Sequence, residues 1–76
     1  MNKNIIEKKI REIFSDISEI DIEFDLPYIT VMTNYEYITG KQITKLKGLE
    51  WDFNLKISSI GISHEKKIEI ELCKVD

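Results

Sequence analysis

Apolar residues at helical spacing open the chain. Between residues 4 and 17 the apolar side chains are Ile5, Ile6, Ile10, Ile13, Phe14 and Ile17. Intervals of one, three and four residues place such side chains on one face of a helix, with the charged residues opposite. We therefore predict an amphipathic helix over residues 4–17. Its cap is Asn4, paired with Glu7, or alternatively Asn2.

After this helix, apolar residues recur at every second position. The stretch EIDIEFDL, residues 19–26, alternates strictly between apolar and acidic residues, which predicts a strand buried on one face. Pro27 ends it in a turn over residues 25–28, and YITVMT, residues 28–33, predicts the return strand of a hairpin. Ile29 and Val31 are expected to face the core, and the opposite face is expected to carry Tyr28, Thr30 and Met32.

A second, shorter helix is expected to follow Thr39. Thr39 and Gln42 have the spacing of a capping box, and Gly48 stands where a C-cap glycine would end the helix. The next stretch, GLEWDFNLKI, alternates again, so we predict a strand over residues 49–57. Its core-facing residues would be Leu49, Trp51, Phe53, Leu55 and Ile57. Alternatively, Trp51 and Phe53 protrude at the far end of the hairpin and form an aromatic anchor for a partner.

The alternation slips by one residue after Ile57. Ile60 and Ile62 are even-numbered, which predicts a β-bulge at Ser58 and Ser59. The residues SHEKK then turn the chain, and IEIELCKV predicts a last strand. Its core face would carry Ile68, Ile70 and Leu72, and its other face Glu69, Glu71 and Cys73.

These elements predict one α+β domain over residues 1–76, an αββαββ two-layer sandwich. Two helices would cover one face of a four-stranded antiparallel sheet. The connectivity resembles a ferredoxin-like fold whose first strand has moved to the C-terminus, and that resemblance implies the spatial strand order third, fourth, second, first. An intertwined dimer of two αββ halves is the alternative.

The charges are distributed unevenly over this predicted fold. The chain has 11 Lys and Arg against 14 Asp and Glu, a net charge of −3. The uncovered sheet face would collect seven acids, opposed there by Lys56 and Lys67, while the basic residues gather on the helices. The expected partner-binding residues are Tyr28 and these seven acids, Asp21, Glu23, Asp25, Glu50, Asp52, Glu69 and Glu71. The alternative interpretation is an ordinary solvated face.

Candidate chemistry is sparse in this sequence. His64 has no Ser, Cys or Asp arrangement around it that would make it a catalytic base, and Cys73 is the single cysteine. The carboxylates would lie on an open sheet and not in a concave site, so no enzyme, cofactor or metal is expected. Charged residues interrupt every short apolar run of residues 1–14, so we expect neither a signal peptide nor a membrane span there, and the lone thiol fits the cytoplasm.

We therefore expect a non-enzymatic protein-binding module that engages a basic partner surface. Small acidic phage and mobile-element proteins, among them anti-CRISPR proteins, inhibit nucleic-acid-binding proteins by this logic, and the likeness is one of charge and size. A bias toward Lys and Ile, as AT-rich codons produce, agrees with such a source. The alternatives are an RNA- or single-strand-DNA-binding domain that uses the basic helical side, and an oligomerising accessory subunit, with a homodimer possible.

Overall fold

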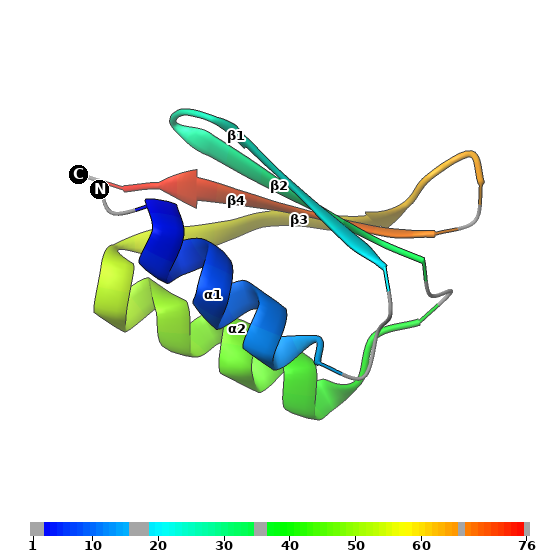
Figure 1. Cartoon of the computed structure of the whole chain (residues 1–76), viewed down its shortest axis with the longest axis horizontal. Coiled ribbons are helices and arrows are strands. Elements are labelled where there is room, and N and C mark those ends of the chain that lie inside the picture. Colours follow the sequence, from blue (N-terminus) through cyan, green and yellow to red (C-terminus); the bar gives the residue numbers. More distant parts are fainter. Residues whose placement is uncertain (1–2, 16–18, 35–36, 66, 76) are drawn as a thin grey trace.

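The chain folds into two layers, a sheet and a pair of helices. The computed structural model describes residues 3–15, 19–34, 37–65 and 67–75. The elements follow in the order α1 (Lys3–Ile13), β1 (Ile20–Asp25), β2 (Tyr28–Thr33), α2 (Gly40–Phe53), β3 (Leu55–Ile62) and β4 (Ile68–Lys74). Both helices lie side by side on one face of the sheet, whose other face is open (Figure 1). The predicted α+β fold class and its two-layer arrangement are confirmed.

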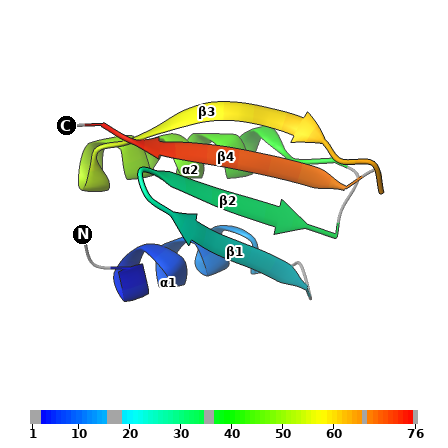
Figure 2. The same ribbon diagram turned by 90° about the horizontal axis from the view of Figure 1, so that it is seen from above.

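The sheet is antiparallel, with the strand order β1-β2-β4-β3 (Figure 2). This is the predicted spatial order read from the opposite edge. The β1–β2 turn lies at Leu26 and Pro27, as predicted, and their peptide bond is cis. Whether the chain is a circular permutant of a ferredoxin-like fold stays a prediction.

The core lies between the sheet and the helices. The central strands contribute Ile29, Val31, Ile70 and Leu72, each at most 1% exposed, and β1 packs partly buried apolar side chains beside them. The face assignments predicted for β1, β2 and β4 are therefore confirmed. Successive side chains of a strand point to opposite faces of the sheet, so apolar residues at every second position share one face, and here the helices cover that face.

Helix α1 contributes Ile6 and Ile10 to this core, and Phe14, the residue after its end, is also buried there, as predicted. It differs from the prediction at both ends. Lys3 is already helical, so Asn4 lies inside the helix and is not its cap, and the alternative cap, Asn2, lies outside the described residues. The helix ends at Ile13, and the predicted helical residue Ile17 also lies outside the described residues.

Helix α2 begins where predicted and runs further than predicted. Thr39 is its N-cap: the Thr39 hydroxyl accepts from the Gln42 amide at 3.1 Å, and the Gln42 side chain accepts from the Thr39 amide at 2.9 Å. Gly48 does not end the helix. The C-cap is Asn54, which adopts the left-handed conformation with φ 54° and ψ 43°, a conformation that asparagine tolerates better than most residues.

The predicted strand over residues 49–57 is therefore wrong in its first half. Leu49 remains in the core because it lies on the same helical face as Leu46, whereas Trp51 points away and is 88% exposed. Phe53 packs partly buried against the core. A strand would have buried Trp51 with its odd-numbered neighbours, but the helix rotates it by about 200° from Leu49.

The bulge predicted in β3 is present. Ile57 pairs with Leu72 and Ser59 with Glu71, so one residue of β3 is unmatched between them. After it, Ile60 and Ile62 return to the helix-side face opposite Ile70 and Ile68. They are nevertheless 40% and 67% exposed. The far end of the β3–β4 hairpin extends beyond the helices and leaves these side chains uncovered (Figure 1).

Candidate interaction face

The open face of the sheet carries five carboxylates. The strand register places its residues in rows that run across the sheet, and Glu23, Thr30, Glu71 and Ser59 form the middle row. The row on one side is Asp21, Met32, Glu69 and Gly61, and the row on the other is Asp25, Tyr28, Cys73 and Lys56. We call the five carboxylates of these rows the acidic face: Asp21, Glu23, Asp25, Glu69 and Glu71.

The acidic face consists of two lines of charge. Three carboxylates follow β1 and two follow β4, with about 7 Å between successive carboxylate-bearing residues along each strand. Strand β2 separates the two lines, which puts them about 10 Å apart. The acids are thus close enough to act on one partner and far enough apart to stay individually hydrated.

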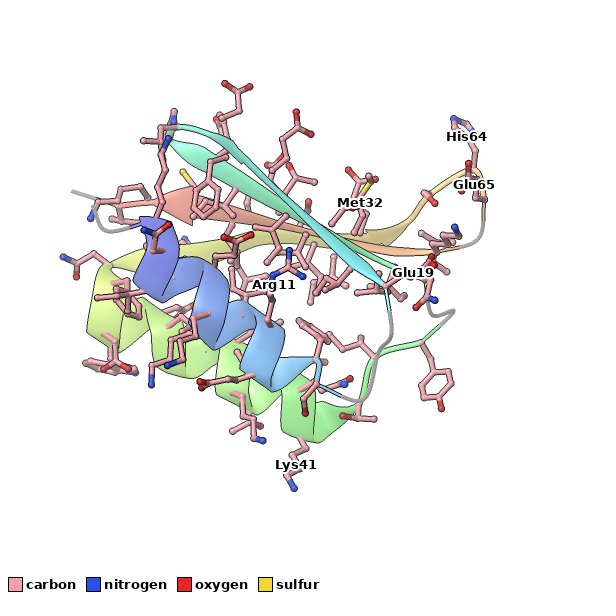
Figure 3. The ribbon with its side chains drawn as sticks, in the orientation of Figure 1. Arg11, Glu19, Met32, Lys41, His64 and Glu65 are labelled. Atoms are coloured by element: carbon pink, nitrogen blue, oxygen red, sulfur yellow. The ribbon has the colours of Figure 1, made fainter. Side chains whose placement is uncertain are left out.

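Uncharged side chains lie between the two lines on β2. Met32, 40% exposed, is flanked by Asp21 and Glu69, and Tyr28, 44% exposed, is flanked by Asp25 and Cys73. Met32 projects from the sheet on the side away from the helices (Figure 3). Apolar contact area beside carboxylates suits a lysine or arginine side chain, whose aliphatic stem and cationic head need different surroundings.

Two of the seven acids predicted for this face lie elsewhere. Glu50 and Asp52 belong to α2, because the helix continues to Phe53. The Glu50 carboxylate accepts from the Ile57 amide at 3.4 Å, and Asp52 lines a groove between the two helices beside Lys9 and Lys45. The sequence prediction failed for both because it began the strand too early.

The positive charge near the acidic face is small. Lys56 lies on the open side of β3, across from Cys73, as predicted. Lys67, the other predicted counter-charge, lies just before β4, at the end of the acidic face where Asp21 and Glu69 line the same hollow. Its ammonium nitrogen is 3.3 Å from a carboxylate oxygen of Glu65. Among the described residues of the open rows, five carboxylates therefore face one amine.

A hollow of about 300 Å³ opens at one end of the acidic face. It lies where the end of β2, the start of β1 and the β3–β4 turn meet, and Glu19, Met32, His64 and Glu65 belong to its lining (Figure 3). Asp21 and Glu69 of the acidic face also line it. Sequence patterning did not identify this hollow, because it forms between segments that only the sheet register brings together.

The described residues at this end of the sheet include His64, and Cys73 lies at the other end of β4. His64 is exposed in the turn, as predicted, and the turn is closed by bonds between Ser63 and Lys67. The Cys73 thiol is half-buried, 3.6 Å from the Lys74 carbonyl. Within the described part of the chain, no group of three or more His, Cys, Asp or Glu side chains is arranged to hold a metal ion.

The helices carry charge of both signs. Seven cations lie on α1 and α2, where the sequence predicts them: Lys3, Lys8, Lys9, Arg11, Lys41, Lys45 and Lys47. Four acids share those helices: Glu7, Glu12, Glu50 and Asp52. Arg11 is held by Glu7 at 3.2 Å and by the Ile20 carbonyl at 3.5 Å, whereas Lys41 points away from the sheet (Figure 3). The helical side is positive overall and less uniform than the acidic face.

Comparison of the chain with protein-family models, with curated proteins and with solved structures gave no match. Fold and surface are therefore the basis for a functional proposal. Neither helix, in the part of the chain that the structure describes, has the length and apolar character that crossing a membrane requires.

Proposed function

We propose that this protein is a non-enzymatic binding module whose acidic face engages a basic surface of a protein partner. One observation supports the proposal above the others: in the described rows of the open sheet face, five carboxylates stand with one lysine, Lys56, although the whole chain carries a net charge of only −3. Lys67 lies at the end of that face. An ordinary solvated face would mix the two signs more evenly. Uniform charge accelerates encounter with an oppositely charged partner and excludes like-charged ones.

The class of partner follows from the arrangement of the acids. Two lines of negative charge about 10 Å apart are comparable in spacing with the grooves of B-DNA, about 6 Å and 12 Å wide. A protein surface that normally holds nucleic-acid phosphates would meet similar charges here. We therefore propose that the partner is a nucleic-acid-binding protein and that occupation of its basic surface inhibits it, in the manner of a phage or mobile-element inhibitor.

Met32 and Tyr28 complete the proposed contact. Each is exposed on β2 between the lines of acids, so a partner arginine or lysine can lay its stem on one of them and its charge on the neighbouring carboxylates. Such contacts carry affinity after electrostatic attraction has brought the surfaces together. A free thiol at Cys73 is compatible with a reducing compartment, and we place this activity in the cytoplasm.

Capture from extracts of the native host tests the proposal. The face variant carries Glu23→Lys and Glu71→Lys, and the matched control carries Glu12→Lys and Asp52→Lys on the helices, with the same change in net charge. We expect the unmodified protein and the control to retain the same basic protein, and the face variant to lose it. The complex should weaken strongly between about 0.1 and 0.5 M salt, over which screening shortens from about 10 Å toward a few ångströms.

Competition completes this experiment. Duplex DNA or RNA that binds the captured protein should displace the module, since both would occupy the same basic surface. Retention of the partner by the face variant, or simultaneous binding of nucleic acid and module, would contradict the proposal. If the module itself binds nucleic acid, and Lys41→Glu with Lys45→Glu abolishes that binding, the helical side is the functional surface and the protein is a nucleic-acid-binding domain.

A further inference from the structure

The two edges of the sheet differ in how they are protected. Strand β1 carries Asp21, Glu23 and Asp25 along one edge, so a second copy pairing there would bring six carboxylates onto adjacent strands. Strand β3, at the other edge, has no charged residue between Lys56 and Glu65. Charged side chains are a common means of preventing edge-to-edge pairing, and the second half of β3 lacks it.

The register of β3 shows which backbone groups are free. The β3–β4 turn is closed by the Ser63 amide, which donates to the Lys67 carbonyl at 2.8 Å. Bonded and non-bonded pairs alternate in an antiparallel ladder, so the Gly61–Glu69 pair is bonded and the pairs formed by Ile60 and Ile62 are not. The amide and carbonyl groups of Ile60 and Ile62 therefore point away from β4, toward the open edge.

In the first half of the β3 edge, a side chain from α2 already binds an outward-pointing backbone amide. By the ladder pattern, the Ile57 amide also points outward, and there the Glu50 carboxylate of α2 accepts it at 3.4 Å. A carboxylate at this point hinders another strand from pairing. The accessible edge is thus confined to residues 59–63, of sequence SIGIS.

We propose that this edge pairs with the same edge of a second copy, antiparallel and centred on Gly61. In that register Ile60 lies opposite the partner's Ile62 and Ile62 opposite the partner's Ile60, and these pairs exchange four backbone hydrogen bonds. No charge lies within the paired segments. The isoleucine side chains, 40% and 67% exposed in one chain, meet on the helix side and cover one another.

The symmetry of this pairing has a consequence for the open face. Two antiparallel edge strands in one continuous sheet are related by a two-fold axis perpendicular to it. Both open faces then lie on the same side of an eight-stranded sheet, and ten carboxylates face one direction. The dimer proposal is supported by the geometry of the β3 edge and does not depend on the proposed function. The dimer's use as a longer acidic surface rests on the proposed function.

The proposed interface is small, so the dimer is expected to be weak. Five residues on each side bury less than the roughly 1,200 Å² of a standard interface, which is the size of weak, transient contacts, and we expect a dissociation constant on the order of 100 µM. Sedimentation equilibrium between about 5 µM and 1 mM should show the mass rising from 9.0 kDa toward twice that value. A constant mass over this range would overturn the proposal.

Substitution locates the interface. Ile62→Lys should lower the association constant at least tenfold, and Ile5→Lys on α1 is the control, since both side chains are well exposed in the single chain. Circular dichroism establishes that each variant is folded. In the unmodified protein, backbone NMR signals of residues 59–63 should shift on dilution, and shifts confined to β1 or to the helices would overturn the proposal.

Different variants test the dimer and the proposed function. Ile62→Lys leaves all five carboxylates of the acidic face in place, so this variant should still capture the basic partner, as a single copy. Loss of dimerisation with capture intact is the expected result. For the variant that carries Glu23→Lys and Glu71→Lys, we expect the opposite result: capture is lost and the sedimentation behaviour is unchanged.

Discussion

The side-chain carboxylate of Glu50 accepts a hydrogen bond from the backbone amide of Ile57 at 3.4 Å. These two residues lie on either side of Asn54, where α2 ends and β3 begins. The bond fastens the end of the helix to the start of the strand. Residues 48–57 thus form two kinds of structure, although their apolar residues alternate throughout.

Asn54 makes this change of direction possible, and its backbone conformation can be tested. We predict that Asn54→Val lowers the free energy of unfolding by about 1 to 2 kcal/mol, because a β-branched residue is strained at positive φ. Asn54→Gly should stay within about 0.5 kcal/mol of the unmodified protein. Urea denaturation measures both, and equal stabilities for Val and Gly would show that residue 54 does not adopt this conformation.

Trp51 and Leu49 should respond oppositely to truncation. Leu49 is 4% exposed and Trp51 is 88% exposed. We predict that Leu49→Ala costs about 2 to 5 kcal/mol and Trp51→Ala less than about 0.5 kcal/mol. Trp51 fluorescence should resemble that of tryptophan in water and be quenched fully by acrylamide. A blue-shifted, protected signal would instead support the strand predicted from the alternation.

The capping box of α2 should contribute measurably to stability. The Thr39 hydroxyl accepts from the Gln42 amide, so Thr39→Ala leaves that amide without its side-chain acceptor. We predict a loss of about 1 kcal/mol, with a smaller loss for Thr39→Ser, which keeps the hydroxyl. Thermal unfolding monitored by circular dichroism provides the comparison. Similar losses for Ala and Ser would indicate that the methyl group, and not the cap, matters.

Repulsion within the acidic face should make stability depend on salt. Glu71 lies about 7 Å along β4 from Glu69 and about 10 Å across the sheet from Glu23. We predict that Glu71→Gln raises the free energy of unfolding by a few tenths of a kcal/mol at low ionic strength, and that about 0.5 M salt removes the gain. Glu12→Gln on α1, where lysines are near in sequence, is the control. A gain that persists at high salt would point to a cause other than charge.

The sequence predicted much of the fold because single residues mark its boundaries. Thr39 with Gln42 defines the start of α2, Pro27 defines the first turn, and the change of phase after Ile57 reveals the bulge. Each of these signals acts over a few residues and needs no tertiary contact. The strand order was implied by the resemblance of the αββαββ connectivity to a ferredoxin-like fold, and the observed order agrees with it.

Residues 49–53 could not be assigned in this way. Leu49, Trp51 and Phe53 alternate with Glu50 and Asp52, which satisfies a strand, while Leu46, Leu49 and Phe53 also satisfy a helix. The helix was missed because Gly48 was taken as its end, yet a glycine inside a helix costs only about 1 kcal/mol. Burial of Leu49 and Phe53 against the sheet offsets that cost.

The sequence by itself determined which side chains alternate on β1 and β4, and therefore that their five acids share a face once those strands join one sheet. The tertiary structure decided that Glu50 and Asp52 belong to the helical layer, that Trp51 faces water, and that a hollow opens beside Met32. The physical reason is the range of the forces involved. Period and capping act within a few residues, whereas the length of α2 and the exposure of the β3 edge depend on which surfaces remain to be covered after the layers have packed.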